Sequence, residues 1–163
     1  MGKKKPVIDK SAKVGSDAKV KDSAQVLDDA KVTGTASIRG SAVVDKSARV
    51  TGRAVVKDRA RVTDRAWVRQ DALIAGDAVV GGSVRVFSDA DVTGDAVLTG
   101  HARIGPRARV SDSKHVVTVV SNGSIWTAYR TKKDGVAVLK GSGKAKLSDA
   151  PSDLRKSITW TKV

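Results

Sequence analysis

Residues 44–68 read VDKSARVTGRAVVKDRARVTDRAWV, and an aliphatic residue returns in them at every sixth position. The same period continues in both directions, from Ile8 to Val110, without a miss. The aliphatic positions are Ile8, Val14, Val20, Val26, Val32, Ile38, Val44, Val50, Val56, Val62, Val68, Ile74, Val80, Val86, Val92, Leu98, Ile104 and Val110. Ala stands four residues after each of the first seventeen, except where Val84 replaces it. The chain is therefore a repeat protein with the template aliphatic-x-x-x-Ala-x.

The six-residue period also indicates the secondary structure. It matches neither the 3.6 residues of an α-helix nor the heptad of a coiled coil, whereas the local Ala-x-Val alternation has the two-residue period of a strand. Turn-forming pairs such as Gly34-Thr35 and Gly76-Asp77 separate the short apolar segments. Each hexapeptide is predicted to form one short strand and one corner of a coil.

The amino-acid composition favours a thin, regular core without long helices. Aromatic residues make up 3% of the chain, and all 17 acidic residues are Asp, which hydrogen-bonds its own local backbone and so favours turns. The absence of cysteine excludes disulfides and thiolate metal sites. No apolar run approaches the length of a membrane span, so we expect a soluble chain with no membrane partner.

This template resembles that of the hexapeptide-repeat family. The resemblance implies a left-handed parallel β-helix of triangular section, with three hexapeptides in each coil; the left hand comes from the resemblance alone, because parallel crossovers generally favour the right hand. The predicted fold is all-β: a basic tail at residues 1–7, a hexapeptide-repeat solenoid of about six coils at residues 8–115, and a small β-rich or α+β domain at residues 116–163.

After Ser113 the period stops, and a different pattern begins. Three strands, one helical turn and a closing strand are predicted at Val116–Val120, Ile125–Thr131, Val136–Leu139, Asp149–Leu154 and Ile158–Thr161. The segment Trp126–Gly135 resembles a small C-terminal domain of hexapeptide-repeat proteins from phages and prophages, which implies a virion or phage-encoded accessory role. The alternative is that residues 116–163 only cap the open edge of the solenoid.

One face of the predicted solenoid is basic. At a step of 18 residues, one coil per step, its outward positions hold Lys13, Lys31, Arg49, Trp67, Arg69, Arg85, Phe87 and Arg103. Cations spaced by roughly 4.8 Å along a sheet, with exposed aromatic rings among them, are suited to an anionic partner such as nucleic acid or another polyanion. The alternative is a solvated charged face that discourages lateral growth of the sheet.

The other two faces carry aliphatic residues at outward positions. These candidate interface residues are Leu27, Val43, Val79 and Val97 on one face, and Val55 and Leu73 on the other. Contiguous apolar surface usually marks protein contacts. Proteins of the hexapeptide-repeat family commonly pack side by side as trimers, so we expect a homotrimer or docking onto a larger assembly.

The sequence offers little for enzyme chemistry. Some relatives with this helix are zinc carbonic anhydrases, which need three imidazoles, but His101 and His115 are the only histidines here. Acyltransferases of this fold interrupt the repeat with an extruded loop and use a histidine base, whereas this repeat is unbroken. No catalytic residue, metal, cofactor or small-molecule substrate is predicted, and a hexapeptide acyltransferase is the third alternative.

The leading hypothesis is a non-enzymatic structural or attachment protein, such as a capsid decoration or tail component of a phage virion. The alternative is a protein that binds nucleic acid or another polyanion through the basic face, which the net charge of +14 would favour. The basic start of the chain has no apolar signal region behind it. The expected location is the virion, or the cytoplasm before assembly.

Overall fold

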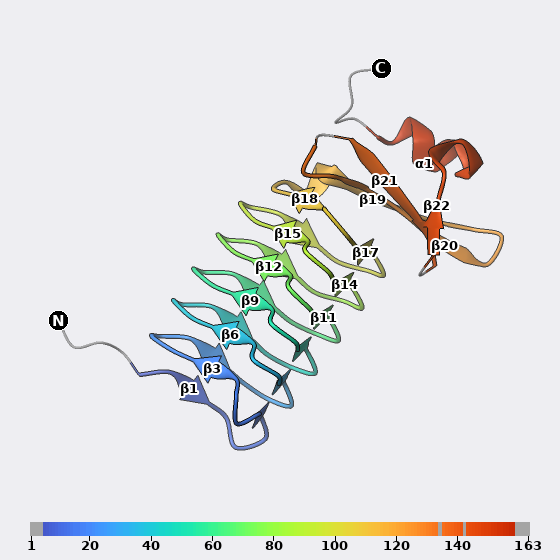
Figure 1. The fold of residues 1–163 in the computed structure, drawn as a ribbon. Helices are drawn as coiled ribbons and strands as arrows, with labels where there is room; N and C mark the ends of the chain where they lie inside the picture. The colour runs from blue at the N-terminus through green and yellow to red at the C-terminus, as the bar shows by residue number, and fades with distance from the viewer. Residues whose placement is uncertain (1–4, 134, 142, 159–163) are drawn as a thin grey trace.

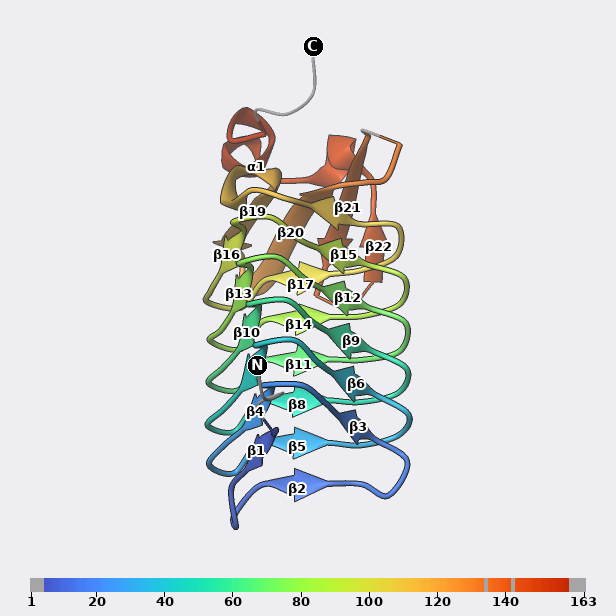
Figure 2. The ribbon, with the colours of Figure 1, turned by 90° about the vertical axis from the view of Figure 1, so that its left-hand side faces the viewer.

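The protein, described by a computed structural model over residues 5–133, 135–141 and 143–158, is a solenoid closed at one end by a small antiparallel sheet (Figure 1). Eighteen two-residue strands form three parallel six-stranded sheets, one on each side of the coil (Figure 2). Sheet A contains β1 (Val7–Ile8), β4 (Gln25–Val26), β7 (Val43–Val44), β10 (Arg61–Val62), β13 (Val79–Val80) and β16 (Val97–Leu98). Sheet B contains β2 (Lys13–Val14), β5 (Lys31–Val32), β8 (Arg49–Val50), β11 (Trp67–Val68), β14 (Arg85–Val86) and β17 (Arg103–Ile104). Sheet C contains β3 (Lys19–Val20), β6 (Ser37–Ile38), β9 (Val55–Val56), β12 (Leu73–Ile74), β15 (Asp91–Val92) and β18 (Arg109–Val110).

The register of the three sheets is set by the repeat. Each residue pairs with the residue 18 positions later, as Trp67 does with Arg85, so identical template positions stack along the axis. The predicted all-β solenoid of about six coils, with a β-rich end, is therefore confirmed. Its left hand stays a prediction that the resemblance implies.

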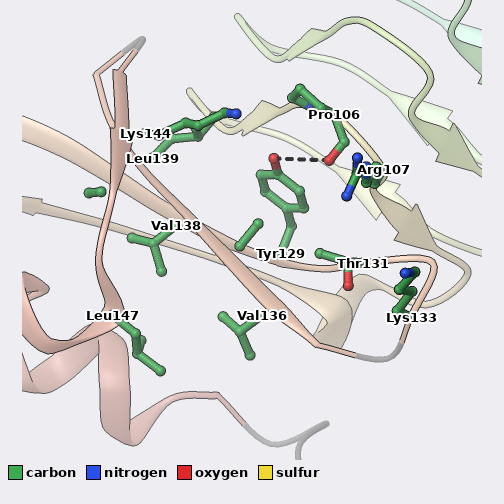
Figure 3. A pocket seen from close by; sticks show the side chains of 12 residues that line it. Pro106, Arg107, Tyr129, Thr131, Lys133, Val136, Val138, Leu139, Lys144 and Leu147 are labelled. Carbon is green, nitrogen blue, oxygen red and sulfur yellow. Dashed lines mark hydrogen bonds between the residues drawn. The ribbon is translucent and has the colours of Figure 1, made fainter.

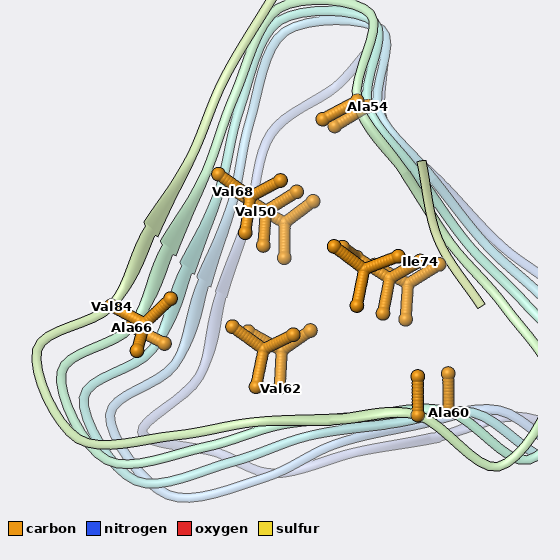
Figure 4. Packing of buried hydrophobic residues seen from close by; sticks show 14 of the residues in the cluster. Val50, Ala54, Ala60, Val62, Ala66, Val68, Ile74 and Val84 are labelled. Atoms are coloured by element: carbon orange, nitrogen blue, oxygen red, sulfur yellow. The ribbon is translucent and has the colours of Figure 1, made fainter. Parts of the chain in front are cut away.

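The core is filled by the aliphatic and alanine positions of the template. In every repeat from Val26 to Val110 the aliphatic side chain is at most 3% exposed. Figure 4 shows how Val50, Val62, Val68 and Ile74 meet inside the triangle while alanines line its corners. Ala fills these corners in the other repeats, and Val84, which is also fully buried, shows that one corner accommodates a larger side chain.

From Val20 to Leu98, a left-handed residue stands two positions after each inward aliphatic side chain and forms the corner. Gly52 has φ +73°, and a Cβ there would lie 2.8 Å from the backbone nitrogen of Gln70 on the next coil. Where Asp takes this position, its carboxylate can accept from a backbone N–H one coil later. The pairs are Asp22 with Gly40 (3.1 Å), Asp58 with Gly76 (3.2 Å) and Asp64 with Gly82 (2.8 Å). A Glu side chain is one methylene longer, which gives a physical reason for Asp at these corners.

The C-terminal residues form a cap over the last coil. It contains η1 (Ser113–His115), the antiparallel strands β19 (Val116–Ser121), β20 (Ser124–Arg130), β21 (Val136–Lys140) and β22 (Gly143–Ala145), then η2 (Leu147–Asp149) and α1 (Ser152–Lys156). Three of its side chains accept backbone N–H groups at the ends of the three parallel sheets. The bonds are Val97 N–H to Ser113 Oγ (2.8 Å), Arg103 N–H to Thr127 Oγ1 (3.3 Å) and Ser111 N–H to His115 Nδ1 (3.4 Å).

Most of the cap follows the sequence prediction. The three predicted strands correspond to β19, β20 and β21, while β22 was not predicted. The helical turn begins at Ser152 rather than at Asp149, and Pro151 precedes it without a side-chain cap. Ile158 lies outside any strand, and the rest of the predicted closing strand lies outside the described residues.

Candidate polyanion-binding face

The outward residues of sheet B form a column that is basic at every position except Trp67. In register along the axis stand Lys13, Lys31, Arg49, Trp67, Arg85 and Arg103, each the direct neighbour of the next. The two-residue strands fix this column because their inward Val or Ile side chains are locked in the core. Neighbouring strands of a sheet lie roughly 4.8 Å apart, so the cations are forced into proximity.

The two aromatic residues of this face form cation–π contacts with Arg69. The guanidinium carbon of Arg69 lies 4.7 Å from the centre of the Trp67 ring and 5.3 Å from that of Phe87. Arg85 also approaches the Trp67 ring, at 5.9 Å, and the Trp67 Nε1–H donates to Thr51 Oγ1 at 3.2 Å. Both aromatic side chains are half-buried rather than exposed, so the prediction of exposed rings was wrong. The rings position a cation instead of offering free stacking surfaces.

None of the six cations of sheet B forms an ion pair with another described residue. They are Lys13, Lys31, Arg49, Arg69, Arg85 and Arg103. Elsewhere on the solenoid some cations are paired between successive coils, as Lys46 is with Asp64 at 2.7 Å and Arg53 with Asp71 at 2.6 Å. Others, such as those around sheet C at positions 19, 21 and 39, form no ion pair with a described residue, so sheet B differs in how many cations stand together. Burial, and then repulsion from Arg85 and Arg69, lowers the pKa of Arg103. Positive charge on sheet B is thus concentrated without an anionic partner among the described residues.

A hollow of about 500 Å³ lies at the capped end of this face. It is lined by Arg65, Ser83, Arg85, His101, Arg103 and Ile125. Two of these, Arg85 and Arg103, belong to the predicted basic column. Sequence reasoning missed Arg65, Ser83 and His101, although their 18-residue spacing predicts that they stack at one corner.

The predicted apolar interface is less exposed than the sequence suggested. Leu27, Val43, Val55, Leu73 and Val79 are half-buried. Among the predicted interface residues only Val97, at 50%, is exposed. The structure brings Val79 beside Val97 and Val55 beside Leu73, while Arg61 separates Val43 from Val79.

More apolar surface is exposed at the first coil. Val7 is 51% and Ile8 48% exposed, since the described residues include no cap at this end. Self-association through the predicted interface residues stays a prediction.

The two histidines lie in different environments. His101 is exposed in the hollow, whereas His115 is buried in the cap, where Arg130 Nη1 approaches its Nε2 at 3.3 Å. Within the part of the chain that the structure describes, no three His or Asp side chains gather as a metal site. In the same residues, no helix is long and apolar enough to cross a membrane.

The geometry defines this protein as a three-sheet parallel β-solenoid with one capped end and one basic face. Comparisons with protein families, with curated proteins and with solved structures found no match.

Proposed function

We propose that this protein is a non-enzymatic attachment protein that holds an extended polyanion along sheet B. The observation that carries the proposal is the set of six cations on sheet B, five in the column and Arg69 beside it, that have no ion-pair partner among the described residues. Core packing fixes the column along the solenoid axis, so it can meet successive charges of a polymer without reordering the backbone. The net charge of +14 would add long-range attraction.

The side chains favour recognition of phosphate or sulfate groups over recognition of bases. Arginine guanidinium groups bind such oxyanions in bidentate geometry, and four of the six cations are arginines. Base stacking would need free aromatic faces, but Arg69 lies over both Trp67 and Phe87. The hollow beside Arg85 and Arg103 has the volume for one anionic group of the polymer to be held more deeply.

Two charge-matched triple variants test this proposal. Arg49→Gln, Arg85→Gln and Arg103→Gln together remove three charges from sheet B; Lys19→Gln, Lys21→Gln and Arg39→Gln remove three exposed charges from around sheet C. Fluorescence anisotropy would measure affinity for labelled dextran sulfate and for a 20-nucleotide oligo-dT. We expect about a 100-fold loss for the sheet B variant and a few-fold loss for its control. Equal losses would refute a defined face, and binding of only one polymer would identify the anionic group.

The assignment to a protein family and to a phage particle rests on the residue pattern. The unbroken template of residues 8–113 supports placing the solenoid in the hexapeptide-repeat family, left hand included. The place on a phage particle is implied only by the resemblance of Trp126–Gly135, whose residues 126–129 are buried and build the cap. Mass spectrometry of purified phage particles carrying the gene would test it.

A further inference from the structure

A second hollow, of about 450 Å³, lies between the last solenoid corner and the cap. Figure 3 shows Tyr129 at its centre, with Pro106 and Arg107 of the solenoid on one side and residues of β21 on the other. Its apolar lining includes Val136, Val138, Leu139 and Leu147. Leu147 is 39% exposed there.

The shape of this hollow follows from the length of β22. That strand pairs with β21 only from Val138 to Lys140, so Val136 and Ala137 extend beyond its end. The chain then turns away through η2, which places Leu147 at the rim. The hollow is therefore built into the edge of the cap sheet, and it is distinct from the basic face of sheet B.

The polar groups around this apolar lining are cationic or neutral donors. Arg107, Lys133 and Lys144 line the hollow, and none of its described lining residues is acidic. Asp89 lies near, but its carboxylate accepts from the Arg107 N–H at 2.9 Å and is 3.9 Å from Lys132 Nζ. Its charge is therefore engaged by Arg107, which lines the hollow, and by Lys132, which does not.

The Tyr129 hydroxyl supplies a neutral donor in the interior. Burial raises the pKa of Tyr129 to about 12, so the hydroxyl keeps its proton at neutral pH. It donates to the Pro106 carbonyl at 3.5 Å, which is long for an O–H donor. Because this bond is long, the hydroxyl could donate instead to a ligand oxygen at little cost.

From these features we propose that the hollow binds a small amphipathic anion, with an apolar body against Val136, Val138 and Leu147 and a carboxylate or similar head beside Lys144 and Arg107. Its volume falls within the range of small-molecule sites, which are mostly apolar with a few placed polar groups. A neutral apolar molecule would leave the cations unused, and a highly charged polymer would leave the apolar lining unused.

Isothermal titration calorimetry with sodium decanoate, and with decanol as its uncharged counterpart, tests this proposal on the full chain. We expect the protein to bind decanoate and to bind decanol at least about tenfold more weakly. No heat from decanoate at millimolar concentration, or equal binding of the two, would overturn the proposal.

Two pairs of neighbouring substitutions locate the site. Lys144→Gln and Lys146→Gln each remove one exposed cation, but only Lys144 lines the hollow. Leu147→Glu and Ser148→Glu each add one negative charge at an exposed position, but only Leu147 lines it. We expect about threefold to fivefold weaker decanoate binding for Lys144→Gln and about tenfold for Leu147→Glu, with both neighbours within about twofold of the unmodified protein.

The same measurement separates this site from the proposed function. The triple Gln variant of sheet B should bind decanoate as the unmodified protein does, even where it no longer binds polyanion. Equal effects within either neighbour pair, or loss of decanoate binding in the sheet B variant, would contradict a site in this hollow. Thermal unfolding of each variant would establish that it is folded.

Discussion

Sheets A and B are built on the same core, but their outer surfaces carry different charged residues. On sheet A, the outward positions flanking the inward residues hold one cation, Arg61, and two acids, Asp9 and Asp45; Arg61 pairs with the buried Asp45. On sheet B, the equivalent positions hold six cations and no acid. In a solenoid the core sets only the inward template positions, so the outward columns are free to differ. A cation can therefore stabilise the fold on one face and be available to bind a ligand on the next.

The largest expected effect comes from the core that both faces share. Ile74→Ala should destabilise the protein by about 3 kcal/mol, because the fully buried side chain leaves a cavity that the rigid coils cannot close. Ile8→Ala, at the open first coil and 48% exposed, should cost under about 1 kcal/mol. Urea unfolding would measure both. Similar losses would mean that the Ile8 side chain is covered in solution.

The two faces should differ most clearly in how much stability the protein loses when one arginine is removed from each. Arg61→Gln on sheet A should destabilise the protein by about 2 kcal/mol, because Asp45 is left as a buried carboxylate whose Oδ1 already lacks a partner. The value allows for the half-exposed Arg61 side chain. Arg85→Gln on sheet B should change stability by no more than about 0.5 kcal/mol, since it also relieves repulsion with Arg103. If thermal unfolding showed Arg85→Gln to be the more destabilised variant, a stabilising role for Arg61 and an unpaired Arg85 would be contradicted.

Removing the ring that positions Arg69 should have a smaller effect, on binding. Trp67→Leu keeps an apolar side chain but loses the cation–π contact with Arg69 and the bond to Thr51. We expect about threefold to tenfold weaker polyanion binding, equivalent to about 1 kcal/mol. Ser37→Ala, at the equivalent template position of sheet C, is the control. An increase in affinity for oligo-dT would instead indicate that the ring had restricted access.

Acidification should weaken the corners between the sheets while leaving the cations of sheet B charged. The Arg107 backbone N–H lowers the pKa of Asp89, and the Lys46 side chain, with the Gly82 N–H, lowers that of Asp64. Because the folded-state pKa lies below the unfolded value, this stabilisation is present above about pH 4 and is lost as pH falls through the folded pKa. Thermal unfolding between pH 7 and pH 3 should show the loss. Asp89→Asn should reduce the pH dependence slightly.

The sequence predicted the solenoid well because one rule applies to every coil. The aliphatic period and its alanine partner specify strand, corner and register together, and the column of sheet B follows from the 18-residue step. The contact of Arg69 with Trp67 and Phe87 could not be read from spacing, since it depends on side-chain rotamers across adjacent strands. Thr127 and His115 accept hydrogen bonds from the last coil. Both residues lie in the non-repeating cap, so no sequence period predicts these bonds. The hollow near His101 was predictable in part, because residues 65, 83 and 101 share one template position.

Nuclear magnetic resonance would show whether sheet B holds the polyanion. Two-dimensional ¹H–¹⁵N spectra would be recorded while the protein is titrated with short dextran sulfate or oligo-dT. We expect the shifted amide signals to come mainly from β8, β11, β14 and β17 and from the corner residues Ser83 and His101. Equal shifts at Lys19, Lys21 and Arg39, or shifts confined to the cap, would contradict a polyanion site on sheet B.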